Sequence, residues 1–388
     1  MSLRWVACGV ATVAFLTITT TAEAQGLNDV LGRLLSNGCS ALGGPSATTY
    51  GPDLGAFCAN GGGAATATGG TAGSEVRTGG EEQRSVYRRL RQRQGSASAD
   101  TRGTQGFSLF FSADYQKYEQ DTTGFESAFE RDTVGGTLGA DYLFRNGLVV
   151  GAAFNYGHEF GDYDGIAGGF DHDAFGFLVY GSVTPVAGLF FDAVAGYTIR
   201  DYGFERRISF ANNNAAVSGP TRGDTTGNEF KVGVNAGYDF LFGPVTIGPR
   251  AAVLYRETTI DGFRESGRTG LELAYGDQNI ESLTTSFGVF GSVAISTGVG
   301  VIVPQASADY VHEFLDDQRS VRFRLVQDLT GNQFLFQTSH PDRNYFNLGV
   351  GVSMVLRNGM QPFLNFRELV GYNDRSSHTV TAGLRIPF

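Results

Sequence analysis

Segments in which apolar and polar residues alternate recur from about residue 106 to the carboxyl end of the chain. In the last ten residues every second residue is apolar, namely Val380, Ala382, Leu384, Ile386 and Phe388. A period of two is typical of a β-strand with one apolar and one polar face. Strands of about ten residues with this pattern suit a transmembrane β-barrel, whose outer face meets lipid and whose inner face meets water.

The alternation predicts twelve strands, at residues 106–118, 131–145, 148–161, 171–184, 189–207, 225–242, 245–259, 281–297, 300–315, 343–357, 360–373 and 377–388. Every second connection is a tight turn rich in Gly, Pro and Asn, at 145–147, 185–188, 243–244, 298–299 and 358–359. Most other connections are long and polar, for example 208–224 and 260–280. Short turns on one side, long loops on the other and an even strand number indicate an outer-membrane barrel with both ends in the periplasm.

Aromatic residues gather at the strand ends and predict girdles at the two membrane interfaces: Tyr142, Phe144, Tyr156, Tyr197, Tyr238, Phe240 and Tyr255. A soluble β-sandwich would also alternate, but it needs neither such long strands nor aromatic strand ends. We therefore favour an all-β, up-and-down transmembrane barrel over a soluble enzyme or lectin. We expect it to be a monomer in contact with outer-membrane lipid and lipopolysaccharide.

The composition supports a membrane barrel and argues against some partners. Glycine is abundant, at 56 residues, and no run of 18 apolar residues follows the amino-terminal region, so no transmembrane helix is expected in the mature chain. The formal net charge of -10 argues against nucleic acid as a partner.

Residues 1–24 are typical of a secretory signal peptide, with Arg4 before an apolar stretch and an Ala-Glu-Ala cleavage site ending at Ala24. A membrane anchor is disfavoured because the apolar stretch is short. Export would leave Cys39 and Cys58, for which we predict a disulfide in an oxidising compartment, worth roughly 3 kcal/mol. Two cysteines without nearby histidines do not indicate a metal site. The rest of 25–80 is rich in Gly, Ala and Thr and is predicted to be mostly disordered.

Residues 81–94 are charged, unlike the Gly-, Ala- and Thr-rich segment 25–80. Together with a linker to residue 104 they form the last segment before the barrel at 105–388. Two glutamates open this stretch and five arginines follow, which suits a helix dipole: Arg84, Arg88, Arg89, Arg91 and Arg93. As a helix the stretch would be about 21 Å long. A solvated, charged linker is the alternative interpretation.

Two stretches resemble a known family. Residues 139–156, GADYLFRNGLVVGAAFNY, resemble the early hairpin of the autotransporter β-domain, the translocator of type V secretion. Residues 304–314, PQASADYVHEF, resemble a late strand of that family. The resemblance covers about residues 105–388. It implies a twelve-stranded outer-membrane barrel that carries an amino-terminal passenger through its pore. It also implies insertion by the barrel-assembly machinery, which would read the terminal strand at Leu384, Ile386 and Phe388. The passenger here would be at most residues 25–80, which is short for the family.

The resemblance also implies a helix threaded through the barrel, and residues 81–94 hold the matching place. The alternation directs several acids into the lumen, including Asp114, Asp192, Asp239 and Asp309, with Asp141 and Glu313 beside them. It also directs arginines there, namely Arg145, Arg200, Arg250, Arg256, Arg357 and Arg385, so the lumen is predicted to be mixed in charge. Our hypothesis is that the five arginines of 81–94 help to plug the pore through charge-assisted contacts with this lining.

A search for catalytic residues found no motif for a nucleophile, a P-loop or a dinucleotide, and we expect no cofactor. His172 lies between two aspartates and His312 precedes Glu313, but on a strand these neighbours face the opposite side. The alternating run 319–325 could form a hairpin above the membrane or contact lipopolysaccharide phosphates, and we favour the hairpin. Three functions remain: a translocator with a minimal passenger, which we favour, a small pore or structural barrel, and, more remotely, an outer-membrane hydrolase.

Overall fold

The computed structural model describes residues 106–164, 168–211, 216–327 and 333–388, with the backbone alone at 209–211 and 216–217. The predicted signal peptide, the segment 25–80 with Cys39 and Cys58, and the predicted helix 81–94 lie outside the described residues. Within the described ranges, no helix is long and apolar enough to cross a membrane.

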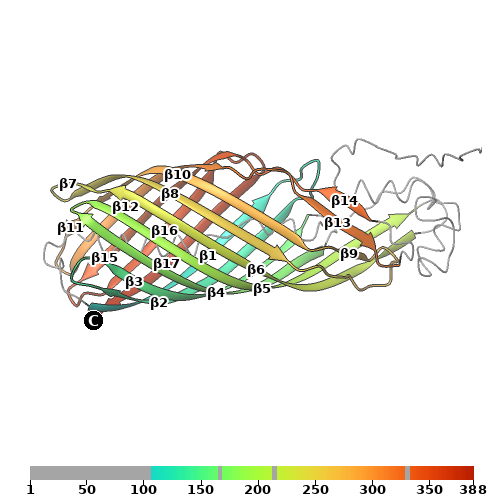
Figure 1. Cartoon of the computed structure of the whole chain (residues 1–388), viewed down its shortest axis with the longest axis horizontal. Coiled ribbons are helices and arrows are strands. Elements are labelled where there is room, and N and C mark those ends of the chain that lie inside the picture. Colours follow the sequence, from blue (N-terminus) through green and yellow to red (C-terminus); the bar gives the residue numbers. More distant parts are fainter. Residues whose placement is uncertain (1–105, 165–167, 212–215, 328–332) are drawn as a thin grey trace, which may run out of the picture.

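Most of the described chain forms an antiparallel sheet that closes on itself, and β9 (Leu273–Tyr275), β13 (Ser320–Leu325) and β14 (Phe334–Gln337) form a second, three-stranded sheet (Figure 1). The closed sheet has 14 strands, of which β7 (Phe240–Phe242) and β11 (Ile295–Ser296) are short pieces next to turns, leaving twelve barrel strands. These are β1 (Gly106–Gln120), β2 (Phe129–Leu143), β3 (Val149–Tyr163), β4 (Gly168–Val186), β5 (Leu189–Ala211), β6 (Ala216–Tyr238), β8 (Val245–Ile260), β10 (Gln278–Val293), β12 (Gly300–Glu313), β15 (Asn344–Leu356), β16 (Gln361–Val370) and β17 (Arg375–Pro387). The first and last strands pair, with Phe111 opposite Leu384 and Leu109 opposite Ile386, so the predicted twelve-stranded barrel is confirmed.

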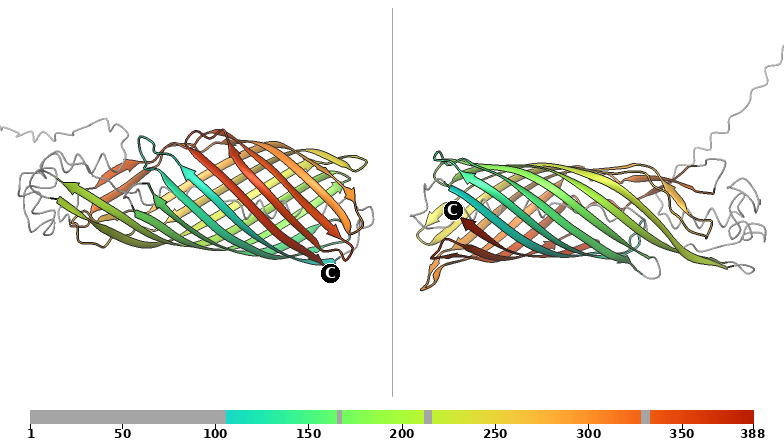
Figure 2. Two further views of the ribbon diagram at one scale, coloured as in Figure 1. Left: turned by 180° about the vertical axis from the view of Figure 1, so that it is seen from behind. Right: turned by 90° about the horizontal axis from the view of Figure 1, so that it is seen from below.

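The two faces of the barrel follow the alternation in the sequence. Large apolar side chains point outward and are exposed, for example Phe111 at 54%, Leu138 at 58% and Phe287 at 61%. Their neighbours in sequence point inward, where Ser112 and Thr137 are buried. An outer face this apolar is stable only against hydrocarbon, as expected for a barrel that spans a membrane. The strands tilt strongly across the barrel axis in every view (Figure 2).

The tight turns and both barrel ends lie at one end of the molecule. Gly147 and Gly188 have φ values of 82° and 88°, a left-handed conformation that glycine adopts without steric cost. Figure 1 shows the carboxyl terminus at the same end as β7 and β11. Phe388 donates its backbone N–H to the carbonyl of Phe107 over 2.9 Å, and the two rings lie 6.3 Å apart. Rings also pair here on the outside, with Tyr142 and Phe144 4.9 Å apart between centroids.

Much of the glycine in the strands serves packing inside the barrel. Phe110 lies directly opposite Gly139, and a Cβ atom at Gly139 would come within 2.2 Å of its ring. Four more inward rings lie over the glycine opposite them in the same way, namely Tyr180 over Gly151, Phe170 over Gly161, Phe190 over Gly237 and Phe363 over Gly383. A shift of register would place each ring against a side chain, so these pairs help to fix the register.

Two predicted loops are wrong in part, because the structure continues beyond the barrel. Residues 208–224 were expected to form a long loop, but β5 runs to Ala211 and β6 starts at Ala216, so most of this stretch is a hairpin. Its small and polar residues, such as Gly219 and Gly223, hide the alternation. The hairpin rises past the barrel and packs against residues of the connection 260–280. This connection was also expected to be a loop but contains β9 (Leu273–Tyr275).

We call this outer structure the cap. It comprises the far ends of β5 and β6, the segment 263–266, β9, β13 (Ser320–Leu325) and β14 (Phe334–Gln337). β13 pairs with β14 and β9, so the predicted run 319–325 does form a hairpin. The core of the cap consists of apolar side chains that are at most 6% exposed, namely Ile208, Phe263, Leu271, Leu273, Tyr275, Val321, Phe323, Leu325 and Phe336. The cap lies at the end opposite the tight turns (Figure 1).

The barrel lumen as candidate functional site

One wall of the lumen holds a chain of buried ion pairs, which we call the wall network. Arg131 of β2 lies 3.7 Å from Glu159 of β3, and Arg200 of β5 lies 3.3 Å from the same carboxylate. Arg200 also reaches Glu229 of β6 at 3.2 Å, and Lys231 lies 2.9 Å from Glu229. Alternation brings these charges together, because each occupies an inward position of its strand.

The wall network is almost closed to solvent. The side chains of Arg131, Glu229 and Lys231 are only 1–2% exposed. Buried ions require partners with good geometry, since each loses several kcal/mol of hydration. Three cations share two carboxylates here, so each carboxylate is held between two cations. Sequence reasoning missed Arg131, Glu159 and Glu229 as luminal charges. The available signal was the i, i+2 spacing of Glu229 and Lys231 on one face of a strand.

The four predicted lumen acids divide into two pairs. Asp192 accepts hydrogen bonds from Ser182 (2.7 Å) and Asn235 (2.8 Å), and Asp239 pairs with Arg250 at 3.0 Å. These two carboxylates therefore have partners in the wall itself. Asp309 and Asp114 line two adjoining cavities in the lumen.

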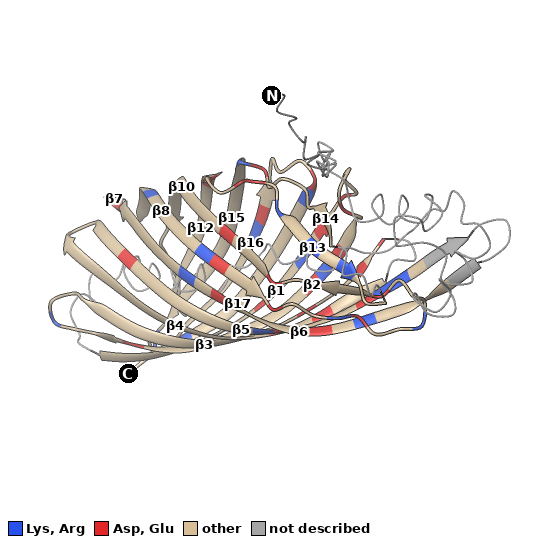
Figure 3. Ribbon diagram, turned by 45° about the vertical axis from the view of Figure 1, so that its right-hand side comes forward, with Lys and Arg blue, Asp and Glu red and all other residues tan. Residues whose placement is uncertain are grey.

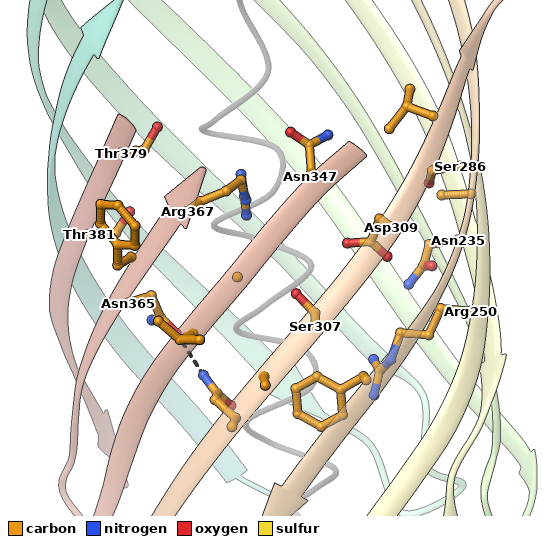
Figure 4. Close-up of a pocket in the computed structure, with 18 of the residues that line it drawn as sticks. Asn235, Arg250, Ser286, Ser307, Asp309, Asn347, Asn365, Arg367, Thr379 and Thr381 are labelled. Carbon is orange, nitrogen blue, oxygen red and sulfur yellow. Dashed lines mark hydrogen bonds between the residues drawn. The ribbon is translucent and has the colours of Figure 1, made fainter. Parts of the chain in front are cut away.

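The two cavities follow the wall formed by β8, β10, β12, β15, β16 and β17. The cavity at Asp309 measures about 210 Å³, and Figure 4 shows Asp309, Ser307 and Asn235 pointing into it beside Arg250. On its other side Gln305 donates to Asn365 over 2.7 Å. The cavity at Asp114 measures about 380 Å³ and lies nearer the cap. Its lining also includes Arg256, Arg367 and Glu313, so it carries both signs of charge.

The predicted lumen arginines lie in two kinds of place. Arg200, Arg250, Arg256 and Arg385 face the lumen, and Arg385 donates to Gln361 (3.1 Å) and Ser108 (2.9 Å). Arg145 and Arg357 are exposed at tight turns, so their assignment to the lumen is wrong. The predicted strands ran two residues past the end of β2 at Leu143 and one residue past the end of β15 at Leu356, where the backbone turns. The five arginines of residues 81–94 lie outside the described residues.

The histidines give no sign of a catalytic pair. His172 is 2% exposed, and its ring contacts Phe170, Tyr202 and Phe204 at 4.8–5.2 Å between centroids. The two aspartates beside it face the outside, where Asp173 lies 3.1 Å from His158. His312 contacts Asn344 at 2.7 Å on the outer face, away from Glu313.

The mouth of the lumen is joined to the cap by aromatic rings and one buried ion pair. The rings of Phe204, Phe263 and Tyr275 stack in sequence at 5.3 and 4.7 Å. Arg206 of β5 donates to both carboxylate oxygens of Glu265, at 2.9 and 2.5 Å, and to the Leu271 carbonyl at 3.0 Å. Burial alone would lower the pKa of Arg206, but the Glu265 carboxylate outweighs it and the pKa is raised. The Arg206 guanidinium is therefore charged at any physiological pH.

Comparison with known proteins agrees with this architecture. The family model of the autotransporter beta-domain matches residues 109–367. The translocator domain of autotransporter NalP from Neisseria meningitidis has a TM-score of 0.58 at 15% identity, over 79% of this chain and 96% of that one. The beta domain of the Bordetella autotransporter Brka gives 0.50 at 17% identity, over 73% of this chain and 100% of that one.

Two curated relatives carry the names of enzymes. Esterase EstA of Pseudomonas aeruginosa is 27% identical over 177 residues, which is 43% of this chain and 26% of the esterase. Lipase 1 of Photorhabdus luminescens is 21% identical over 265 residues, which is 64% of this chain and 37% of the lipase. The chain thus spans between a quarter and two fifths of the length of these relatives.

Proposed function

Because the chain belongs to the autotransporter β-domain family, whose model matches residues 109–367, we propose that this outer-membrane barrel displays residues 25–80 on the cell surface. The observation that carries the proposal is the closure of the sheet with both of its ends at the tight-turn end. A segment that precedes β1 starts at that end. It can reach the opposite end only through the lumen, because the closed wall leaves no gap between strands.

The lumen and the preceding segment suit each other in length and charge. Residues 81–105 would span about 37 Å as a helix and more if extended, compared with an apolar band of about 25 Å. The wall from β8 through β10 to β17 and β1 is lined mainly by hydroxyl and amide side chains, and it carries Asp114 and Asp309 beside Arg250, Arg256 and Arg367. The other wall binds its own charges in the wall network. We therefore place the five arginines of 81–94 along the first wall.

The enzyme names of two relatives do not extend to this barrel. The names Esterase EstA and Lipase 1 describe whole proteins of which this chain covers 26% and 37%. The described histidines that lie beside acids, His158 beside Asp173 and His378 beside Glu368, are partly exposed on the outer face of the barrel. We infer no hydrolytic activity for the barrel.

Display of residues 25–80 predicts a specific protease pattern on intact cells. A cleavable epitope tag inserted after Asn60 is expected to be cut by added protease. A tag after Gly267 in the cap serves as the exposed control, and one after Asn358 in a tight turn serves as the protected control. Protection of the Asn60 tag together with cutting of the Gly267 tag would contradict display. It would favour the alternative function of a small pore or structural barrel.

Plugging by residues 81–94 predicts a change in conductance. Deleting 81–94 is expected to raise single-channel conductance in planar bilayers severalfold, because the lumen loses a segment that excludes ions. The matched control deletes the 61–73 tract, which is of similar length and carries no charge. Equal conductance of the full chain and the 81–94 deletion would refute the plug while leaving display open.

A further inference from the structure

The outer face of the cap carries a group of arginines. In β13 the residues Val321, Phe323 and Leu325 are buried in the cap core, so Arg322 and Arg324 point to the opposite, outer face. Arg324 lies opposite Ala274, and Ala274 also pairs with Arg264. Directly opposite residues of an antiparallel pair share a face, so Arg264 and Arg324 flank the small Ala274 on this outer face.

Two more arginines continue the group on the hairpin of β5 and β6. Ser266, two residues from Arg264 and on the same face, pairs with Arg222. Arg222 and its neighbour Arg207 are 69% and 64% exposed. We call Arg207, Arg222, Arg264, Arg322 and Arg324 the arginine face. Figure 3 shows basic segments on β13 and along the hairpin.

The arginine face is poorly neutralised. Glu205 is the carboxylate within it, 3.4 Å from Arg207 and 2.8 Å from Arg222. The hydrogen bond from Arg222 holds the pKa of Glu205 below its usual range. Among the described residues, no carboxylate lies within 4 Å of Arg264, Arg322 or Arg324. Such a concentration of positive charge is unexpected in a chain of net charge -10.

The position of the arginine face relative to the membrane follows from the strands that carry it. Arg207 lies on the same side of β5 as Ile199, whose side chain is 51% exposed on the lipid-facing surface. Eight residues separate them, or ~20 Å of height at 3.3 Å per residue and a tilt of about 40°. Arg222 stands at the same distance from the lipid-facing Phe230 of β6. Arg207 and Arg222 therefore face sideways above the outer leaflet. Arg264, Arg322 and Arg324 lie on the same face of the paired strands.

We propose that the arginine face binds the phosphorylated saccharide core of lipopolysaccharide molecules next to the barrel. Guanidinium groups bind phosphates in a bidentate manner, and side chains that face sideways meet molecules of the same leaflet. The strand residues just below, Asp201 and Asp224, are exposed and acidic, so phosphates at their level would need a divalent cation. The proposal does not depend on what residues 25–80 do.

Binding of purified lipopolysaccharide to the full chain in detergent tests the proposal. The double variant R264S/R322S is expected to bind about 30-fold more weakly, since each arginine near an anionic surface contributes about one factor of five. The matched control R145S/R357S removes two exposed arginines at the tight-turn end and is expected to bind like the unmodified protein. R264K/R322K should retain most binding because it keeps both charges. Heat-modifiable migration in gels shows that each variant is folded.

Two probes separate the sources of binding. Dephosphorylated lipopolysaccharide is expected to bind as weakly to the unmodified chain as intact lipopolysaccharide binds to R264S/R322S. Chelation of divalent cations is expected to leave unchanged the difference in lipopolysaccharide affinity between the unmodified chain and R264S/R322S. Equal affinity for intact and dephosphorylated lipopolysaccharide would overturn the proposal. So would a loss of binding on chelation alone, which would assign the contact to the acidic residues below.

Discussion

Replacement of Arg206 by alanine is expected to open the cap while the barrel stays closed. Arg206 and Glu265 are both 2% exposed, and the change would leave Glu265 buried without its cation. Breaking one side of a buried ion pair costs about 3–5 kcal/mol. The destabilisation is expected to stay within the cap, because Glu265 also accepts the Leu273 N–H at 2.8 Å and so contacts β9 of the cap. Limited proteolysis of the folded protein should therefore cut within 261–277 much faster, while heat-modifiable migration of the barrel persists.

The adjacent arginine provides a matched control for this prediction. Arg207 is 64% exposed and pairs with Glu205 at 3.4 Å. Arg207→Ala is therefore expected to lower the stability of the cap by less than about 1 kcal/mol and to change its rate of proteolysis little. A second variant, R206M/E265L, removes both charges and is expected to recover much of the lost protection. If R206A and R207A were cut at the same rate, the Arg206–Glu265 ion pair would not be what holds the cap together.

Replacement of Glu229 by glutamine is expected to destabilise the barrel itself. The wall network would then hold three cations and one carboxylate, and Lys231, 1% exposed, would lose the carboxylate that lies 2.9 Å away. The expected loss is about 3–5 kcal/mol of unfolding free energy, measured by urea titration in lipid vesicles.

The chain has only two lysines, and the other one supplies the control. Lys117 lies 3.3 Å from Glu130, whose side chain is 61% exposed. Glu130→Gln is therefore expected to cost less than about 1 kcal/mol. Similar unfolding midpoints for E229Q and E130Q would show that the wall network does not support the barrel.

The barrel could be predicted from the sequence because its determinants are local. Outward residues such as Phe111 and Leu138 alternate with inward ones, and glycines such as Gly147 and Gly188 mark the turns. Of the cap only the hairpin at 319–325 could be predicted, because its other strands pair across distant connections, with Phe323 opposite Tyr275. The wall network depends on closure of the sheet in the same way. A charge on one strand does not reveal which acid on another will lie beside it.

The alternation predicts which way a side chain points, but it does not predict which residue of the next strand it will contact. Asp192 and Asp239 face inward as expected, but their wall partners Ser182 and Arg250 become evident only from the paired strands. Recognition of Leu384, Ile386 and Phe388 by the barrel-assembly machinery, the disulfide between Cys39 and Cys58, and the plug remain predictions. Phe388 is 71% exposed beside Phe107, so its ring is accessible from outside the barrel.

The pairs of rings and glycines make the two walls of the barrel mechanically unequal. They lie mainly between β1 and β6, where each ring is in direct contact with the backbone of the glycine opposite. Between β8 and β15 polar side chains lie over the glycines instead, as Asp309 does over Gly288 and Ser307 over Gly349. Solvated contacts reform at little cost when strands bend, whereas close-packed rings resist bending. The cross-section should therefore widen by bowing toward β10 and β12, with the β1 to β6 wall as the fixed side.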